Sequence, residues 1–344
     1  MKTFALSLAL LLILPVILIR LDGQHSGARA QKPGESPNIA DDAGDPIKVD
    51  VDVVNLYCAV RNKQNALISN LEKGDFTLAE DGTQQTIKYF TRETELPLTI
   101  GLLVDVSNSQ QNLIEPERRA AASFFSSVLK KKDVAFLISF GADSELLQDV
   151  TGSPRVLQDG LSRLKLNGGF SGITSGPVPT MSHPRGTVLY DAVYLAANDM
   201  LSKEVGRKAI VLITDGEDQG SRETEKAAIE AAQKSDAIIY GILYVDRQFY
   251  NQGGFNVGGY SGEGVLKQMA EETGGRLFKV DRKNSLDSIF DQIQQEMRTQ
   301  YAIGYTPTNG RKDGSFRKID LRVANKDLKV QVRKGYYAMP NQPQ

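Results

Sequence analysis

The sequence predicts a doubly wound, mostly parallel α/β domain inserted into a small β-sandwich that both ends of the mature chain build together. Residues 96–299 alternate continuous apolar runs with amphipathic stretches, which is typical of a parallel sheet covered by helices on both faces. Residues 48–95 and 300–338 alternate apolar and polar residues between turn signals, as half-buried strands do. Neither flank has enough strands to close a core alone, so we expect the two flanks to share one sandwich.

The expected elements follow from these two patterns. Strands of the sandwich are predicted at 51–60, 71–80, 86–91, 301–306, 316–323 and 328–332, with a tight Asp81-Gly82 turn joining the second and third. Strands of the insert are predicted at 98–104, 134–140, 209–213, 237–244 and 276–280. Helices are predicted at 115–129, 155–164, 189–201, 224–235, 264–273 and 285–297. In such sheets ligands bind at the carboxyl ends of the strands.

Composition excludes several classes of protein and of site. The 344 residues are 40% hydrophobic and 24% charged, as in ordinary globular proteins. With 41 Lys and Arg against 42 Asp and Glu, the net charge of -1 does not favour nucleic acid as a partner. The chain has one cysteine, Cys58, and two histidines, His25 and His183. Structural zinc, haem, iron–sulfur clusters and internal disulfides are therefore excluded, and Cys58 is predicted to be a core residue.

The N-terminus is predicted to be a signal peptide spanning residues 1–30. An apolar run from Phe4 to Ile19 follows Lys2 and is shorter than the roughly 20 residues of a membrane span. Ala28-Arg29-Ala30 has the small-x-small pattern of a cleavage site, which would leave Gln31 first. We expect a secreted or periplasmic protein with no membrane span after cleavage; an uncleaved anchor is the alternative. Residues 31–47 are predicted to be a disordered leader and 339–344 a tail.

Oxygen-bearing side chains gather where strands of the insert end. Asp105, Ser107 and Ser109 follow its first strand at alternate positions, and Asp215 follows the 209–213 strand. Thr187 lies just before a predicted helix, although Thr174 and Thr180 in the preceding loop are alternatives. Two carboxylates and three hydroxyls without nitrogen or sulfur suit a hard cation, Mg²⁺ or in its place Mn²⁺ or Ca²⁺. Each Asp or Ser taken singly would also fit a turn or a helix cap.

The order and spacing of these residues resemble the metal-ion-dependent adhesion site of von Willebrand factor type A domains. The strand pair around Phe76 and the closing segment 333–337 further resemble the secreted bacterial proteins known as von Willebrand factor A-related, abundant in acidobacteria. The resemblance implies that Ser107 and Ser109 bind the metal directly. It implies that Thr187 binds directly or through water and that Asp105 and Asp215 usually act through water or hydrogen bonds. It also implies that a carboxylate of the bound partner completes the metal's coordination.

Three further acidic residues are expected to support this site without binding the metal. Asp191 should hold the loop of Thr187 by hydrogen bonding, and Glu217 and Asp218 should be solvated or support the ligands. The long loops 167–185 and 246–263, rich in Gly, Ser and Asn with Tyr and Phe, are either contact surfaces or mobile surface loops. His183, in the first of them, is expected to be an ordinary loop residue.

We therefore expect a secreted, metal-dependent protein-binding module of the adhesion type, whose partner is a protein or surface component presenting a carboxylate. The alternative is a scaffold subunit of an envelope complex in which the metal is structural. A hydrolase using Asp105 as nucleophile is a weaker alternative, because Ser107 stands where a phosphoryl-transfer enzyme would want a second carboxylate. No Gly-x-Ser-x-Gly elbow and no phosphate-binding glycine loop is present, so we expect no enzyme.

Overall fold

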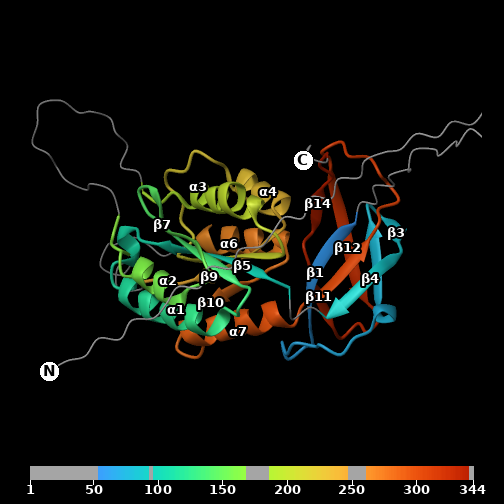
Figure 1. The fold of residues 1–344 in the computed structure, drawn as a ribbon, viewed down its shortest axis with the longest axis horizontal. Helices are drawn as coiled ribbons and strands as arrows, with labels where there is room; N and C mark the ends of the chain where they lie inside the picture. Colours follow the sequence, from blue (N-terminus) through green and yellow to red (C-terminus); the bar gives the residue numbers. More distant parts are fainter. Residues whose placement is uncertain (1–52, 93–95, 168–185, 247–260, 341–344) are drawn as a thin grey trace, which may run out of the picture. The chain divides into compact units, whose positions relative to one another are not determined.

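The computed structural model describes residues 53–92, 96–167, 186–246 and 261–340. Figure 1 shows an α/β domain and, beside it, a β-sandwich. The predicted signal peptide and leader, Thr174, Thr180, His183 and nearly all of the two long loops lie outside the described residues. Within the described ranges, no helix is both long and apolar enough to cross a bilayer.

The α/β domain is built on a six-stranded sheet of order β10-β9-β8-β5-β6-β7. All neighbours pair in parallel except β7, which runs antiparallel to β6 at the sheet edge. The strands are β5 (Leu98–Asp105), β6 (Val134–Phe140), β7 (Ser144–Thr151), β8 (Arg207–Thr214), β9 (Ala237–Leu243) and β10 (Leu277–Lys279). All eight residues of the central β5 are buried, as expected of a strand covered on both faces.

Helices cover both faces of this sheet (Figure 1). One core layer contains α1 (Ile114–Val128), α2 (Pro154–Leu161) and α7 (Leu286–Arg298). The other contains α3 (Leu189–Tyr194), α4 (Glu225–Lys234) and α6 (Ser261–Thr273). The fold class predicted from the alternating apolar runs, a doubly wound and mostly parallel sheet inserted between sandwich strands, is confirmed.

Strands from the two ends of the chain pair in the sandwich. One sheet has the order β13-β1-β11-β4 and the other β14-β12-β2-β3, and every described pairing is antiparallel. The strands are β1 (Val54–Arg61), β2 (Phe76–Glu80), β3 (Thr83–Gln85), β4 (Ile87–Arg92), β11 (Tyr301–Tyr305), β12 (Phe316–Val323), β13 (Lys329–Gln331) and β14 (Gly335–Tyr337). Their shared core includes Cys58, which is fully buried as predicted, together with Leu56, Ile303 and Leu321.

The hairpin around Asp81-Gly82 differs from the prediction. Asp81 has φ 47° and Gly82 φ 81°, the left-handed pair of a two-residue hairpin turn. This turn joins β2 to the short β3, whereas β4 pairs with β11 in the opposite sheet. The predicted pairing of 71–80 with 86–91 was therefore wrong, because the chain changes sheets after Gln85. The segment before Phe76 also differs, since Lys73–Asp75 forms a 3-10 turn instead of strand.

Three other elements departed from expectation. The strands β7 and β14 were not predicted, since polar residues interrupt the first and the second is only three residues long. The helix expected at 189–201 is regular only to Tyr194 and continues as a π-helical segment, Leu195–Met200, and a 3-10 turn. These differences leave the positions of the β5 and β8 ends unchanged.

A fragment of residues 48–95 should not fold alone. Strand β1 has its partners in β11 and β13, and β2 pairs with β12, so all these partners lie after residue 300. Without them the fragment keeps only the short β2–β3 hairpin and leaves its apolar face exposed. We expect no cooperative thermal transition by circular dichroism, whereas residues 48–344 should show one. A cooperative transition in the short fragment would contradict the shared sandwich.

Candidate metal site

Two buried carboxylates meet at the carboxyl edge of the six-stranded sheet. Asp105 is the last residue of β5, and Asp215 directly follows β8, the parallel neighbour of β5. Asp105 is 0% exposed and Asp215 is 1% exposed. Both strands end in register, with Val104 opposite Ile213, and this register brings the two side chains to the same edge.

Local hydrogen bonds fix the orientation of Asp105. Its Oδ1 accepts from the backbone N–H of Ser107 at 2.9 Å, and its Oδ2 accepts from the hydroxyl of Thr214 at 2.5 Å. The Thr214 hydroxyl in turn accepts from the backbone N–H of Gly216 at 3.0 Å. Thr214, which no sequence pattern singled out, therefore ties the end of β5 to the loop that carries Asp215.

The two serines of the first loop do not cap a helix. Ser107 precedes the 3-10 turn Asn108–Gln110 without a side-chain capping bond, and the residue that precedes α1 is Leu113. Instead the hydroxyl oxygens of Ser107 and Ser109 lie 3.0 Å apart. Two hydroxyls this close, one of them on a residue that is 5% exposed, are arranged as a pair of oxygen ligands would be.

Thr187 joins this edge through the backbone on both of its sides. The N–H of Val188 donates to the carbonyl of Gly141 after β6 at 2.9 Å, and the N–H of Gln219 donates to the carbonyl of Thr187 at 2.9 Å. Thr187 is 5% exposed and lies two residues before α3 begins at Leu189. The alternatives Thr174 and Thr180 lie outside the described residues.

The acidic residues that were expected to support the site have different hydrogen-bond partners from those predicted. Asp218 accepts from the N–H of Leu189 at 2.9 Å and from the hydroxyl of Ser221 at 2.5 Å, and so braces the segment after Thr187. Asp191 was expected to hold that segment, but its carboxylate accepts from the N–H groups of Arg222 and Glu223, both at 2.8 Å. That expectation for Asp191 was wrong. Glu217 is half-buried, and its N–H donates to Asp215 at 3.1 Å.

Close backbone packing holds the Asp215 loop against α6. Gly216 has φ 83°, and a Cβ placed on it would lie 2.5 Å from the carbonyl oxygen of Gly262. Only glycine combines this left-handed conformation with so close an approach. The second loop of the site is therefore positioned by the first turn of α6 as well as by β8.

The electrostatics of the site favour a cation. Burial, followed by the negative charge of Asp215, raises the pKa of Asp105 to about 7, against the lowering effect of its hydrogen bonds from Ser107 and Thr214. Two buried carboxylates side by side repel each other, and a divalent cation between or beside them relieves both that repulsion and their desolvation. In the described ranges no three His, Cys, Asp or Glu side chains cluster as metal ligands, so hydroxyls would have to complete the set. The paired Ser107 and Ser109 hydroxyls fit that requirement.

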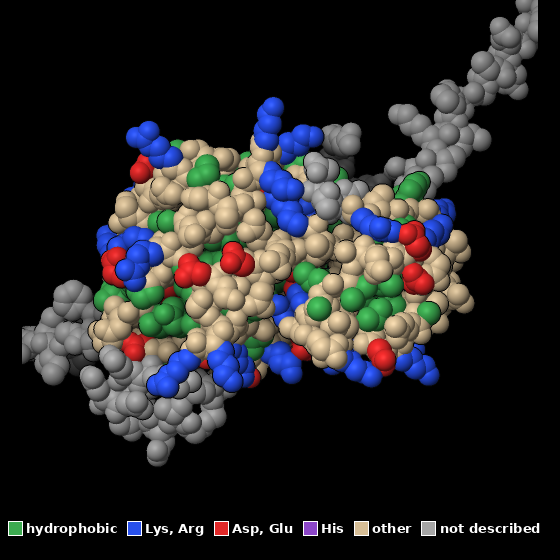
Figure 2. Space-filling view, turned by 90° about the horizontal axis from the view of Figure 1, so that it is seen from below, with side chains coloured by type: hydrophobic (Ala, Val, Ile, Leu, Met, Phe, Trp, Pro, Cys, Tyr) green, Lys and Arg blue, Asp and Glu red, His purple; other side chains and the backbone are tan. Residues whose placement is uncertain are grey.

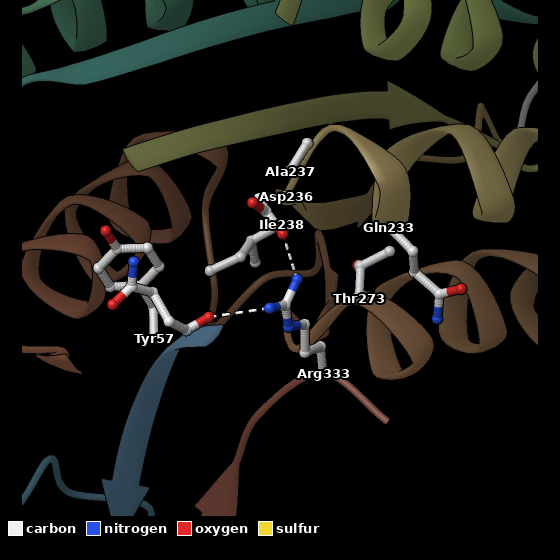
Figure 3. Close-up of a pocket in the computed structure, with 8 residues that line it drawn as sticks. Tyr57, Gln233, Asp236, Ala237, Ile238, Thr273 and Arg333 are labelled. Atoms are coloured by element: carbon white, nitrogen blue, oxygen red, sulfur yellow. Dashed lines mark hydrogen bonds and ion pairs between the residues drawn. The ribbon is translucent and has the colours of Figure 1, made fainter. Parts of the chain in front are cut away.

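Away from the sheet edge, Arg333 joins the α/β domain to the sandwich beside a small cavity. It has a volume of about 20 Å³, the size of one water, and Figure 3 shows Arg333 reaching across it. The Arg333 guanidinium pairs with Asp236 and donates to the carbonyl of Asn55 at 2.8 Å. None of the expected site residues lines this cavity, so we assign it a structural role.

No protein-family model matches the sequence, and no curated protein matches it. Solved structures resemble the fold. An aerotolerance-related membrane protein from Bacteroides fragilis is 21% identical, with a TM-score of 0.41 over 59% of this chain and 98% of that chain. The von Willebrand factor domain of the type V pili tip protein Mfa5 from Porphyromonas gingivalis is 13% identical, with a TM-score of 0.43 over 59% and 95%. Proximal thread matrix protein 1 from the mussel byssus, in a form with a zinc-occupied MIDAS motif, is 11% identical, with a TM-score of 0.45 over 63% and 49%. At sequence identities this low, a shared fold does not imply a shared function.

Proposed function

We propose that this chain is an exported, metal-dependent binding module that captures an acidic group of a partner through a divalent cation at the sheet edge. The observation that carries the proposal is the pair of buried carboxylates, Asp105 and Asp215, beside the paired hydroxyls of Ser107 and Ser109. Ser107, Ser109 and Thr187 would hold Mg²⁺, or Mn²⁺ or Ca²⁺, with the two aspartates supplying negative charge. When bound, the cation supplies a position at which a partner's oxygen can replace water.

The charge of the site explains why the partner should be acidic. Two carboxylates and neutral hydroxyls neutralise a divalent cation without excess, so one more anionic oxygen can still bind favourably. A protein or surface component with an exposed Asp or Glu provides that oxygen. On the face seen in Figure 2, acidic and basic side chains are interspersed and form no continuous basic surface. We therefore propose no nucleic acid as partner.

The hydrolase alternative is less well supported by the same geometry. Both oxygens of Asp105 already accept hydrogen bonds, from Ser107 and Thr214, and the side chain is 0% exposed. A nucleophile needs an oxygen that can reach a substrate. We therefore propose a binding protein and no enzyme. A scaffold subunit with a structural metal is the alternative function, and it predicts metal binding without metal-dependent capture.

Magnesium binding itself is tested by calorimetry on the mature chain and on Ser107→Ala and Asp215→Ala. We expect the wild-type chain to bind one Mg²⁺ and both variants to lose that binding, because each removes an oxygen or a charge from the site. The titration should be run at about pH 8, since protons compete with the cation for a carboxylate whose pKa is raised. The exposed Asp159 of α2 gives a matched control, and Asp159→Ala should bind as the wild type does. Binding that survives both site substitutions would place the metal elsewhere.

A further inference from the structure

An open groove lies where the helices α4 and α6 meet the sandwich. It has a volume of about 570 Å³ and is lined by side chains of α4, α6, β12 and β14. Its two walls are tied together, because the N–H of Lys334, just before β14, donates to the carbonyl of Glu272 in α6 at 3.1 Å. Among the described residues that line the groove, none belongs to the candidate metal site. The proposed metal site therefore does not explain this feature.

Two aromatic rings form the sandwich wall of the groove. Phe316 of β12 pairs directly with Tyr337 of β14, the strand at the edge of its sheet. Their ring centroids lie 5.2 Å apart at an interplanar angle of 63°, an edge-to-face arrangement. Phe316 is 40% exposed, and its ring packs on Gly335, where a Cβ would lie 2.3 Å from the ring. The backbone thus holds an aromatic surface open to solvent, and such surface is enriched in protein interfaces.

The helix wall of the groove is acidic. Glu225 and Glu230 of α4 and Glu272 of α6 line it, and Lys226 is the one basic residue among its described lining residues. Of the three glutamates, only Glu230 forms an ion pair with a described residue, Lys234 at 2.7 Å. One carboxylate oxygen of Glu225 is shielded from water and has no hydrogen-bond partner among the described residues. The groove therefore carries excess negative charge and an acceptor that lacks a donor.

The chain itself shows that this arrangement accepts a cation. Besides pairing with Glu230, the Lys234 ammonium lies 5.3 Å from the centroid of the Tyr337 ring. An ammonium at this distance is attracted by the negative face of the ring. One internal cation thus uses a glutamate and an aromatic ring together. The rest of the groove offers the same two kinds of group to a second cation.

We propose that the groove binds an arginine side chain of a partner protein, with the guanidinium against the aromatic rings and paired with the glutamates. Arginine fits better than lysine, because its planar guanidinium stacks on aromatic rings and pairs with carboxylates through two parallel hydrogen bonds. The inference goes beyond the proposed function, since the groove needs no metal. A groove that only marks the boundary between helices and sandwich would have no preference for a charged side chain.

Calorimetric titration of the mature chain with two synthetic peptides tests this inference. One peptide carries arginines between glycines, and the other carries citrulline in their place, which keeps the shape and is neutral. We expect the arginine peptide to bind, in EDTA as well as in Mg²⁺, and the citrulline peptide to bind about 5–30-fold more weakly. Equal binding of the two peptides, or no binding of the arginine peptide at about 1 mM, would overturn the proposal.

Two substitutions in the groove locate the binding. Glu272→Gln removes a charge and Phe316→Leu an aromatic face, so each should weaken the arginine peptide by about 5–30-fold. Glu115→Gln is the matched control for charge, since Glu115 is 68% exposed on α1 in the other helix layer. Tyr89→Leu is the control for the ring, since Tyr89 is 57% exposed on β4 in the other sheet. Both controls should bind as the wild type does, and wild-type affinity in both groove variants would overturn the role of the groove.

A second copy of the chain is the other candidate occupant of the groove. Self-association in sedimentation that Glu272→Gln abolishes would assign the groove to that copy and overturn the arginine proposal. Ser107→Ala should leave the arginine peptide bound while it removes Mg²⁺ binding. Failure of the metal site and failure of the groove are therefore separate results.

Discussion

Replacing Glu296 by Ala should destabilise the chain by about 3–5 kcal/mol, the cost of removing one partner of a buried ion pair. Glu296 lies near the end of α7 and its side chain is 0% exposed. It pairs with Arg61 of β1, and with Arg276 at 3.2 Å, and it accepts from Gln331 of β13. One carboxylate thus joins the helix layer of the α/β domain to two strands of the sandwich.

The expected loss is large because two guanidinium groups would stay buried without their counter-charge. The side chains of Arg61 and Arg276 are only 11% and 18% exposed. Denaturant titration measures the change in the free energy of unfolding. The control is Glu271→Ala, whose exposed ion pair with Lys267 at 3.9 Å should contribute under about 1 kcal/mol. A loss at Glu296 no greater than at Glu271 would show that this carboxylate does not join the two parts.

Replacing Asp105 by Ala should abolish partner capture. The expected loss of binding free energy is about 2–4 kcal/mol, which lowers the affinity roughly 30-fold to 1000-fold. Asp105 supplies charge to the cation and orients the loop of Ser107, so the metal contact at the centre of the interface would be lost. The fold should survive because the core strands stay apolar on both faces of the sheet. Circular dichroism and the melting temperature should therefore change little.

Capture can be measured by immobilising the mature chain and exposing it to the exported fraction of the producing cell. Asp105→Asn is a second variant, since it keeps an acceptor oxygen for Ser107 or Thr214 and removes the charge. Amidating the carboxyl groups of the exported fraction should abolish capture by the wild-type chain, whereas Asp159→Ala should capture normally. Capture that persists in Asp105→Ala and in EDTA would mean that the metal is structural or absent, and the loop 246–263 would become the leading candidate contact surface.

The parts of the fold and site that the sequence predicted are those set by local patterns. Asp105, Ser107 and Ser109 follow a strand whose buried, continuous apolar run is unmistakable, and Asp215 follows its neighbour. Because parallel strands end at a common edge, the pattern alone placed the two carboxylates together. The two-ended sandwich was predictable for a similar reason, since neither flank could complete a core.

What the sequence could not predict depends on contacts between distant residues. Glu117 follows Glu115 in the first turn of a helix, where acidic residues usually face water and complement the helix dipole. Only the tertiary packing of α1 buries it. That Asp218 and not Asp191 braces the segment after Thr187 likewise depends on bonds spanning about 30 residues, such as the 29 that separate Leu189 from Asp218. The change of sheet after Gln85 follows from pairing with β11, more than 200 residues later in the chain.

Metal-dependent capture is tested most directly by titrating Mg²⁺ into the EDTA-stripped mature chain while measuring both metal occupancy and partner capture. We expect capture to be absent without metal and to rise in proportion to metal occupancy, with the same half-saturating Mg²⁺ concentration for both. Full capture without metal, or a saturated metal site that leaves capture unchanged, would contradict it.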